Sequence, residues 1–206
     1  VGTYTYTVKS IVTSISSTVP VTTQTWTVVV TAPELLGSTA FISTTTGSAA
    51  TADSTTLSST TYLATTAAVA RIDVAQFQDA AKLVPMNTAA TKAVTVTISG
   101  AGAVGEADST AVRGPSVTTA APVAPATVAS TQDYFVFADG RTGKATITIT
   151  VGTTVYTKYF TFVGALATMT ATASKKNVGV AETMTLTAAG VDSSANAVAA
   201  PTVTAV

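Results

Sequence analysis

The chain has 206 residues with ten basic and ten acidic side chains, giving zero formal net charge, and it lacks both cysteine and histidine. Without thiolates or imidazoles, the chain cannot form disulfides, the usual zinc sites, cysteine hydrolase centres or histidine-based triads. Charged residues make up 10% of the sequence, against about 25% in typical domains. No basic stripe suits a nucleic acid or an anionic membrane surface, so we expect neither partner.

Threonine dominates the composition, with 46 of the 206 positions. It is β-branched, favours strands and presents a neutral hydroxyl. No apolar run approaches the ~20 residues of a membrane-spanning helix, although the mean hydropathy is +0.46. We predict an all-β protein without a membrane span, and the zero net charge favours self-association. Both ends read as interrupted strands, which suggests a segment of a longer protein.

The first predicted elements are two alternating strands, GTYTYTVK over 2–9 and QTWTVVVT over 24–31. Each places aromatic and aliphatic residues on one face and mainly threonine on the other. We expect them to pair as a hairpin, with Tyr6 and Trp26 anchoring the core of a sandwich sheet. A lone hairpin is marginally stable in water, so it should complete a larger sheet. Residues 32–34 read as a linker.

The segment 69–77 is the next clear element, and its period of two predicts a strand. Its alternation places Arg71 and Asp73 on the outward face, opposite the apolar residues. One helical turn is expected over 78–83, because Pro85 would end a helix there.

Three segments lead from there to the middle of the chain. Residues 92–99 alternate as a strand, and 134–138 form a short aromatic strand followed by an Asp139–Gly140 turn. The intervening segment 104–129 contains three prolines and is expected over the surface as loops or extra strands.

The stretch 144–163 organises the whole pattern. It predicts a strand over 144–151, a tight turn at 152–153 and a returning strand over 155–163. Tyr156, Phe160 and Phe162 share one face of the second strand, and Val155, Tyr159 and Val163 share the other. Because both faces are apolar, we expect one to pack in the core and the other against a neighbouring strand, module or subunit.

The last forty residues resemble the opening of a further sheet, with Met184 and Leu186 expected on an inner face. The expected elements are strands over 166–174, 182–188 and 198–206, a lysine-tipped turn at 175–177 and a polar turn at 192–196.

Short strands separated by turn signals every 8–12 residues or so are typical of sandwiches. We therefore predict three parts. Residues 1–33 are the C-terminal hairpin of a truncated module, 34–164 form a complete central module with long loops, and 165–206 are the N-terminal strands of a further module.

Five pieces of sequence carry a family resemblance. GTYTYTV (2–8), ADGRTGKATITIT (138–150) and LATMTATASKKNVGVAETMTLTAAGVDSSANAV (166–198) resemble bacterial immunoglobulin-like repeats. ARIDVAQFQDA and KAVTVTISGAGAVG, within 70–105, are similar to repeats of S-layer-like surface proteins of actinobacteria. The resemblance implies tandem immunoglobulin-like β-sandwich modules, secretion to the bacterial cell surface or cell wall, a structural role without enzymatic activity, and often calcium between modules. The central module departs from a minimal repeat by its length.

The ten acidic residues offer no spacing that argues for the paired carboxylates of a glycosidase, so we do not expect an enzyme. Glu106 and Asp108, two residues apart, are the candidate calcium ligands, because calcium prefers clustered carboxylate oxygens. The alternative interpretation is that Glu106 and Asp108 are solvated surface side chains that bind no metal. Asp133 and Asp139 flank the aromatic strand, and Asp139 also reads as a turn former.

Aromatic residues could stack on sugars if exposed, or anchor a core if buried; they are Tyr4, Tyr6, Trp26, Tyr134, Tyr156 and Tyr159. The sequence favours the core. The leading hypothesis is a surface-layer building block that self-associates into arrays and joins adjacent modules of the same chain. The alternative is an adhesin stalk or carbohydrate-binding surface module with glycan partners, and a phage or pilus structural protein is a third possibility.

Overall fold

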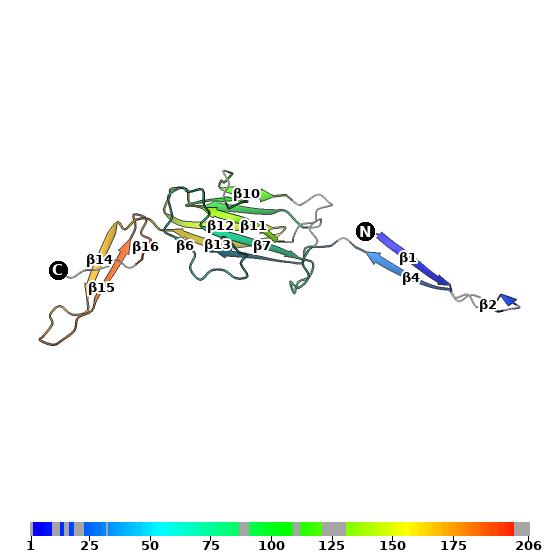
Figure 1. The fold of residues 1–206 in the computed structure, drawn as a ribbon, viewed down its shortest axis with the longest axis horizontal. Coiled ribbons are helices and arrows are strands. Elements are labelled where there is room, and N and C mark those ends of the chain that lie inside the picture. Colours follow the sequence, from blue (N-terminus) through cyan, green and yellow to red (C-terminus); the bar gives the residue numbers. More distant parts are fainter. Residues whose placement is uncertain are drawn as a thin grey trace. The chain divides into compact units, whose positions relative to one another are not determined.

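The computed structural model describes residues 2–9, 13–14, 17–18, 23–31, 33–86, 91–108, 112–120 and 131–199. These residues form strands, turns and loops without a helix, arranged in several sheets (Figure 1). The all-β prediction is confirmed for this part of the chain. The chain divides into two compact units, Val1–Glu34 and Leu35–Val206. Among the described residues, no helix is long and apolar enough to cross a membrane.

The first unit is a ribbon of two long strands, β1 (Gly2–Lys9) and β4 (Thr23–Val30), with a short ladder of β2 (Thr13–Ser14) and β3 (Ser17–Thr18) between them in sequence. β1 and β4 pair antiparallel, so the predicted hairpin is confirmed. The expected burial is wrong. Tyr6 and Trp26 are 56% and 53% exposed, because no described residue forms a second layer over this two-stranded sheet.

The second unit contains two larger sheets. The four-stranded sheet has the order β5 (Gly37–Ser43), β7 (Ala70–Phe77), β11 (Thr131–Phe137), β9 (Ala103–Gly105). The five-stranded sheet has the order β10 (Ser116–Thr119), β8 (Val94–Ser99), β12 (Gly143–Val151), β13 (Thr154–Phe162), β6 (Ser58–Ser59). Their ladders are antiparallel except that of β6 with β13.

A single apolar core joins the inner faces of these two sheets, which gives the unit a sandwich-like architecture. Strict alternation along β8 and β12 places every second residue in the core, as expected for half-buried strands. Ile42 and Ile72 from one sheet and Ile147 and Ile149 from the other are fully buried in this cluster. The alternating pattern in the sequence therefore identified the core-facing side of β8 and β12.

The central hairpin forms as predicted. β12 and β13 pair along their whole length, and Gly152 at their turn has a φ of +58°, a conformation that glycine adopts without strain. Phe160 and Phe162 are fully buried, whereas Val155 and Tyr159 on the opposite face are 58% and 51% exposed. One face thus packs in the core, and the other remains open.

Two segments between strands, 78–83 and 104–129, can be compared with the prediction. The helical turn expected over 78–83 is wrong, because Lys82 has a left-handed φ of 60°. Instead, the Asp79 carboxylate accepts hydrogen bonds from the backbone amides of Leu83 and Val84 and closes an irregular turn. Within 104–129, β10 is an added strand on β8, whereas residues 109–111 and 121–130 lie outside the described part.

The C-terminal sheet has the order β14 (Thr168–Ala173), β15 (Leu186–Val191), β16 (Ala197–Val198). Its second strand begins later than the expected 182–188, because a turn closed by the Glu182 amide on the Gly179 carbonyl, with Ala181 at a φ of 70°, occupies that position. The inward placement of Met184 and Leu186 is also wrong, since they are 41% and 50% exposed. Most of the strand expected over 198–206 lies outside the described residues.

Candidate functional site

A loop covering residues 44–56 lies along the free side of β5 and ties the two sheets together. The Asp53 carboxylate accepts the Ile42 amide at 2.9 Å and pairs with the Lys158 ammonium, on β13 of the other sheet, at 2.6 Å. The Ser54 amide donates to the Ile42 carbonyl at 2.9 Å. One backbone and one side-chain hydrogen bond therefore fasten the loop to the edge strand β5 at Ile42, and the ion pair links it to β13.

A charged cluster of Arg71, Asp73 and Asp133 forms a second contact with the same loop. Asp73 is 3% exposed, and its carboxylate accepts the Arg71 guanidinium at 2.8 Å and the Ala50 amide at 2.7 Å. Asp133, directly opposite Asp73 on β11, also pairs with Arg71 at 2.8 Å. Arg71 and Asp73 therefore point away from the core, as predicted, but the loop buries them.

The cluster raises the pKa values of two of its members, Asp133 and Arg71. Desolvation raises the pKa of Asp133, and the neighbouring Asp73 adds to this effect, while the charge of Arg71 opposes it. For Arg71, desolvation lowers the pKa, but the hydrogen bond and charge of Asp73 and the charge of Asp133 outweigh it and raise the pKa overall. The cluster thus keeps Arg71 charged beneath the loop.

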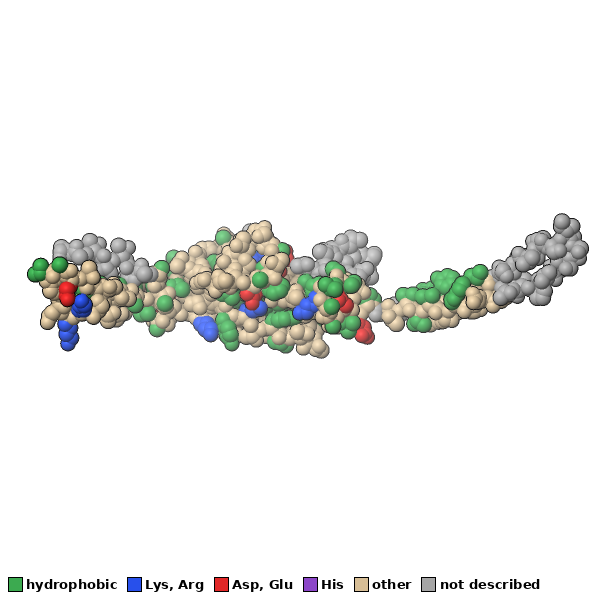
Figure 2. All heavy atoms as spheres, turned by 90° about the horizontal axis from the view of Figure 1, so that it is seen from below, with side chains coloured by type: hydrophobic (Ala, Val, Ile, Leu, Met, Phe, Trp, Pro, Cys, Tyr) green, Lys and Arg blue, Asp and Glu red, His purple; other side chains and the backbone are tan. Residues whose placement is uncertain are grey.

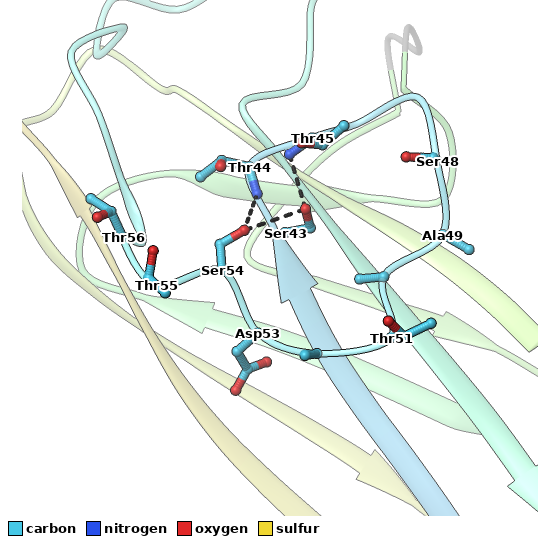
Figure 3. A pocket seen from close by; sticks show the side chains of 12 residues that line it. Ser43, Thr44, Thr45, Ser48, Ala49, Thr51, Asp53, Ser54, Thr55 and Thr56 are labelled. Atoms are coloured by element: carbon cyan, nitrogen blue, oxygen red, sulfur yellow. Dashed lines mark hydrogen bonds between the residues drawn. The ribbon is translucent and has the colours of Figure 1, made fainter.

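The loop borders an open hollow of about 530 Å³ that is lined chiefly by hydroxyl side chains (Figure 3). Ser43 Oγ accepts the Thr45 amide, Ser54 Oγ accepts the Thr44 amide, and Ser54 Oγ donates to Ser43 Oγ at 3.4 Å. The hydroxyls therefore bond to backbone and to each other, which suits hydrogen bonding to a neutral polar ligand. Asp53, the acidic side chain of the lining, already pairs with Lys158.

The outer face of the five-stranded sheet carries hydroxyls in register across neighbouring strands. We call this surface the threonine face; it comprises Thr95, Thr97 and Ser99 of β8, Ser116 and Thr118 of β10, Thr146, Thr148 and Thr150 of β12, and Thr157 and Thr161 of β13. Thr95 and Thr118 share a hydrogen bond of 3.1 Å, and the Thr97 hydroxyl makes a long contact of 3.5 Å to the Thr148 carbonyl. The threonine face is thus polar and largely uncharged.

One corner of the threonine face differs from the rest. The Lys144 ammonium lies 3.9 Å from the centre of the Tyr159 ring, a cation–π geometry in which the ring partly neutralises the charge. Because Tyr159 is half exposed, this corner offers an aromatic ring and a cation beside the hydroxyl rows.

The two predicted calcium ligands lie just after β9. The exposed Glu106 accepts a hydrogen bond from the Thr119 hydroxyl at 2.7 Å, and that hydroxyl accepts one from Tyr134 Oη at 2.9 Å. The Asp108 carbonyl accepts the Ala68 amide. Among the described residues, no group of three or more acidic side chains gathers around a possible metal position. A calcium site at Glu106 and Asp108 therefore remains a prediction, and its ligand set would need further oxygens.

The other acidic side chains mostly build turns. Asp139 accepts the Arg141 amide and pairs with its guanidinium, which confirms its role as a turn former. Asp192 is 3% exposed and accepts the side chain of Asn196 and the amides of Gly164, Ser194 and Asn196. Desolvation favours its neutral form, but these hydrogen bonds outweigh it and lower the pKa of Asp192 to about 2.

The aromatic residues fall into two groups. Tyr134 is fully buried, and desolvation raises its pKa to about 12, while the Tyr156 hydroxyl donates to the Ser38 carbonyl at 2.7 Å and links β13 to β5. In contrast, Tyr4, Tyr6, Trp26 and Tyr159 are all about half exposed. The core interpretation holds for the first group and is wrong for the second.

The sequence pattern did not identify the loop anchors. Asp53 and Lys158 are 105 positions apart, so no local spacing signals their ion pair. Arg71 and Asp73 did have a signal, because an i, i+2 pair of opposite charge on one strand face can pair directly.

No protein-family model matches the chain, and neither does any curated protein.

Proposed function

We propose that this chain is a structural building block of a secreted bacterial surface layer or cell-wall protein, which self-assembles through its β-sheet faces. The observation that carries the proposal is the threonine face, a broad exposed sheet surface with hydroxyls in register and one charged side chain, Lys144, at its margin. Tandem immunoglobulin-like modules and a location at the cell surface are part of the same proposal. They are supported by the resemblance of 2–8, 138–150 and 166–198 to bacterial repeats.

The physical reason concerns the cost of desolvation. Bringing two surfaces together removes water from both, and an unpaired charge in the contact costs far more than a hydroxyl that finds a new partner. Threonine also loses little side-chain entropy on contact, because its χ1 angle is already restricted. A neutral threonine surface can therefore meet a second copy with little penalty, and zero net charge removes long-range repulsion.

A carbohydrate-binding surface module is the second candidate, and two observations favour it. Tyr4, Tyr6 and Trp26 are exposed aromatic rings on one unit, and the other unit has the hydroxyl-lined hollow of the 44–56 loop. Aromatic rings stack on sugar faces, and hydroxyls bond to sugar hydroxyls. In this case the protein would remain monomeric and bind glycan.

Electron microscopy of the purified protein tests the proposal. We expect extended arrays, and we expect the Thr148→Lys variant to lose them, because a charge at the centre of the threonine face must be desolvated in the contact. Thr153→Lys is the matched control, since it adds the same charge at the exposed turn of the same hairpin. Arrays that persist in Thr148→Lys would show that the threonine face is not the contact. Separate particles that bind glycan would support the second candidate.

A calcium chelator in the same experiment tests the predicted metal. If arrays dissolve on chelation, alanine substitutions at Glu106 and Asp108 should reproduce the effect in the presence of calcium. Arrays that resist chelation would remove the reason for a calcium site here.

A further inference from the structure

The β1–β4 ribbon has one face that is apolar except for Gln24, which pairs with Val8 near one end. The cross-strand pairs Tyr4–Val28 and Tyr6–Trp26 lie on this face, and threonines occupy most of the other face. We call it the ribbon face; its large apolar members are Tyr4, Tyr6, Val8, Trp26, Val28 and Val30. Each of them is 43–56% exposed, and Figure 2 shows hydrophobic side chains in a row along one side of the ribbon.

A surface of this kind requires a covering partner. A two-stranded ribbon is at best marginally stable in water, and contiguous exposed apolar surface in proteins marks an interaction site. Because threonine covers most of the opposite face, the ribbon has the amphipathic pattern of one layer of a sandwich that lacks its second layer.

The C-terminal sheet, in the other unit, has a similar exposed apolar face with side chains of different size. The cross-strand pairs Met169–Gly190, Ala171–Ala188 and Ala173–Leu186 lie on this face, which we call the alanine face. Met169 and Leu186 are 51% and 50% exposed. Threonines 168, 170, 172 and 187 lie on the opposite face of this sheet.

The two faces are complementary in side-chain size. Sheets that pack face to face lie about 10 Å apart, and this spacing is filled best when large side chains on one sheet meet small ones on the other. The ribbon face supplies three bulky rings, and the alanine face supplies the small pair Ala171–Ala188 at its centre, with Gly190 covered by the Leu166 side chain at one end. Two ribbon faces would place ring against ring, and two alanine faces would leave a gap.

The area available also fits a weak specific contact. A fully covered aromatic side chain buries about 150–250 Å², so three half-exposed rings and three half-exposed valines offer on the order of 500 Å². With a comparable share from the alanine face, the contact totals on the order of 1,000 Å², the lower limit for specific association. The side chains described on both faces carry no charge, so no charge is desolvated on contact.

We infer that the ribbon face of one copy of this chain docks on the alanine face of a second copy. The contact is heterologous, because each copy contributes a different surface, and repetition produces an open row of molecules rather than a closed dimer. This inference deepens and rests on the proposed self-assembly, because it names a contact that extends the array in one direction, separate from the threonine face.

Two variants of the full chain test the inference, each with one face disabled. Both are made in the Thr148→Lys background, which removes the threonine-face contact of the proposed function and leaves the contact between the ribbon face and the alanine face to be measured by itself. In the ribbon variant, Tyr6→Thr and Trp26→Thr remove both members of the central pair and keep β-branched residues. In the alanine-face variant, Ala171→Glu and Ala188→Lys place an opposite-charge pair on the face, which supports the sheet while blocking the contact. The matched control places the same charges on the opposite face, at the cross-strand pair Thr172→Glu and Thr187→Lys.

Sedimentation velocity over a range of concentrations gives the result. We expect Thr148→Lys itself, and the matched control in the same background, to grow into larger species as concentration rises. We expect each disabled variant alone to stay monomeric, with association weakened by about 30-fold or more, the loss typical of removing central aromatic anchors. Mixed together, the two variants should form a one-to-one heterodimer that grows no further, because a single intact pair of faces remains. The heterodimer also shows that each variant is folded at its intact face.

Other outcomes overturn the inference in distinguishable ways. If the alanine-face variant alone forms a closed dimer, ribbon faces pair with each other. If both variants grow like Thr148→Lys itself, this contact is wrong while the proposed self-assembly stands. If Thr148→Lys itself stays monomeric while the wild type grows, the threonine face assembles the chain and this contact is wrong. If the wild type remains monomeric at every concentration, both the contact and the self-assembly are wrong.

Discussion

Removing the Asp73 carboxylate should release the 44–56 loop and destabilise the second unit. Asp73 is 3% exposed and accepts hydrogen bonds from the Arg71 guanidinium and the Ala50 amide. In Asp73→Ala, Arg71 keeps a single carboxylate partner, Asp133, and the Ala50 amide loses its acceptor.

The structure sets the expected magnitude. Breaking a buried ion pair by removing one partner costs about 3–5 kcal/mol, and the remaining contact to Asp133 places this case near 3 kcal/mol. The matched control is Asp133→Ala, whose side chain is 40% exposed, so its pair with Arg71 should contribute about 1 kcal/mol or less. For a chain of this length, a loss of 3 kcal/mol corresponds to a fall in Tm of about 6–12 °C.

Urea unfolding followed by circular dichroism at low salt measures the difference, because guanidinium would screen the ion pair. Fluorescence of the single tryptophan, Trp26, is unsuitable, since it lies in the first unit. Hydrogen exchange should show faster exchange of the loop amides in Asp73→Ala than in Asp133→Ala. The reasoning is refuted if the two variants lose equal stability or if the loop amides exchange as in the wild type.

Three further predictions concern the core, the link between sheets and the C-terminal turn. Ile147→Asp should lower the free energy of unfolding by several kcal/mol, because it places an unpaired carboxylate at a fully buried position; an unchanged Tm would disprove that placement. Tyr156→Phe should cost about 1 kcal/mol by removing its hydrogen bond to the β5 backbone, whereas Tyr159→Phe on the exposed face should be neutral, and equal losses would contradict the assignment. Since the pKa of Asp192 is lowered to about 2 in the folded state, the unfolded chain binds more protons between pH 2 and about 4, so stability should fall as pH drops through this window. Acid titrations of wild type and Asp192→Asn should differ there, and superimposable curves would exclude the role of Asp192.

Much of the site lay beyond what the sequence alone could predict. Alternation placed Arg71 and Asp73 on the outward face correctly, but it could not show that a loop would bury them. The Asp53–Lys158 pair joins residues 105 positions apart, and such pairing depends on which strands become neighbours. The hydrogen bond from the Thr119 hydroxyl to Glu106 likewise depends on tertiary structure, because Thr119 reaches this position only when β10 pairs with β8.

The sequence by itself determined which residues share a face of each strand and where the tight turns lie. The central hairpin, the β1–β4 pairing and the buried faces of β8 and β12 follow from a period of two, because successive side chains of a strand point in opposite directions. Tertiary structure decided whether anything covers a given face. The same alternation buries Ile147 and leaves Tyr6 and Trp26 exposed, because burial requires a second layer, and periodicity within one strand carries no information about that layer.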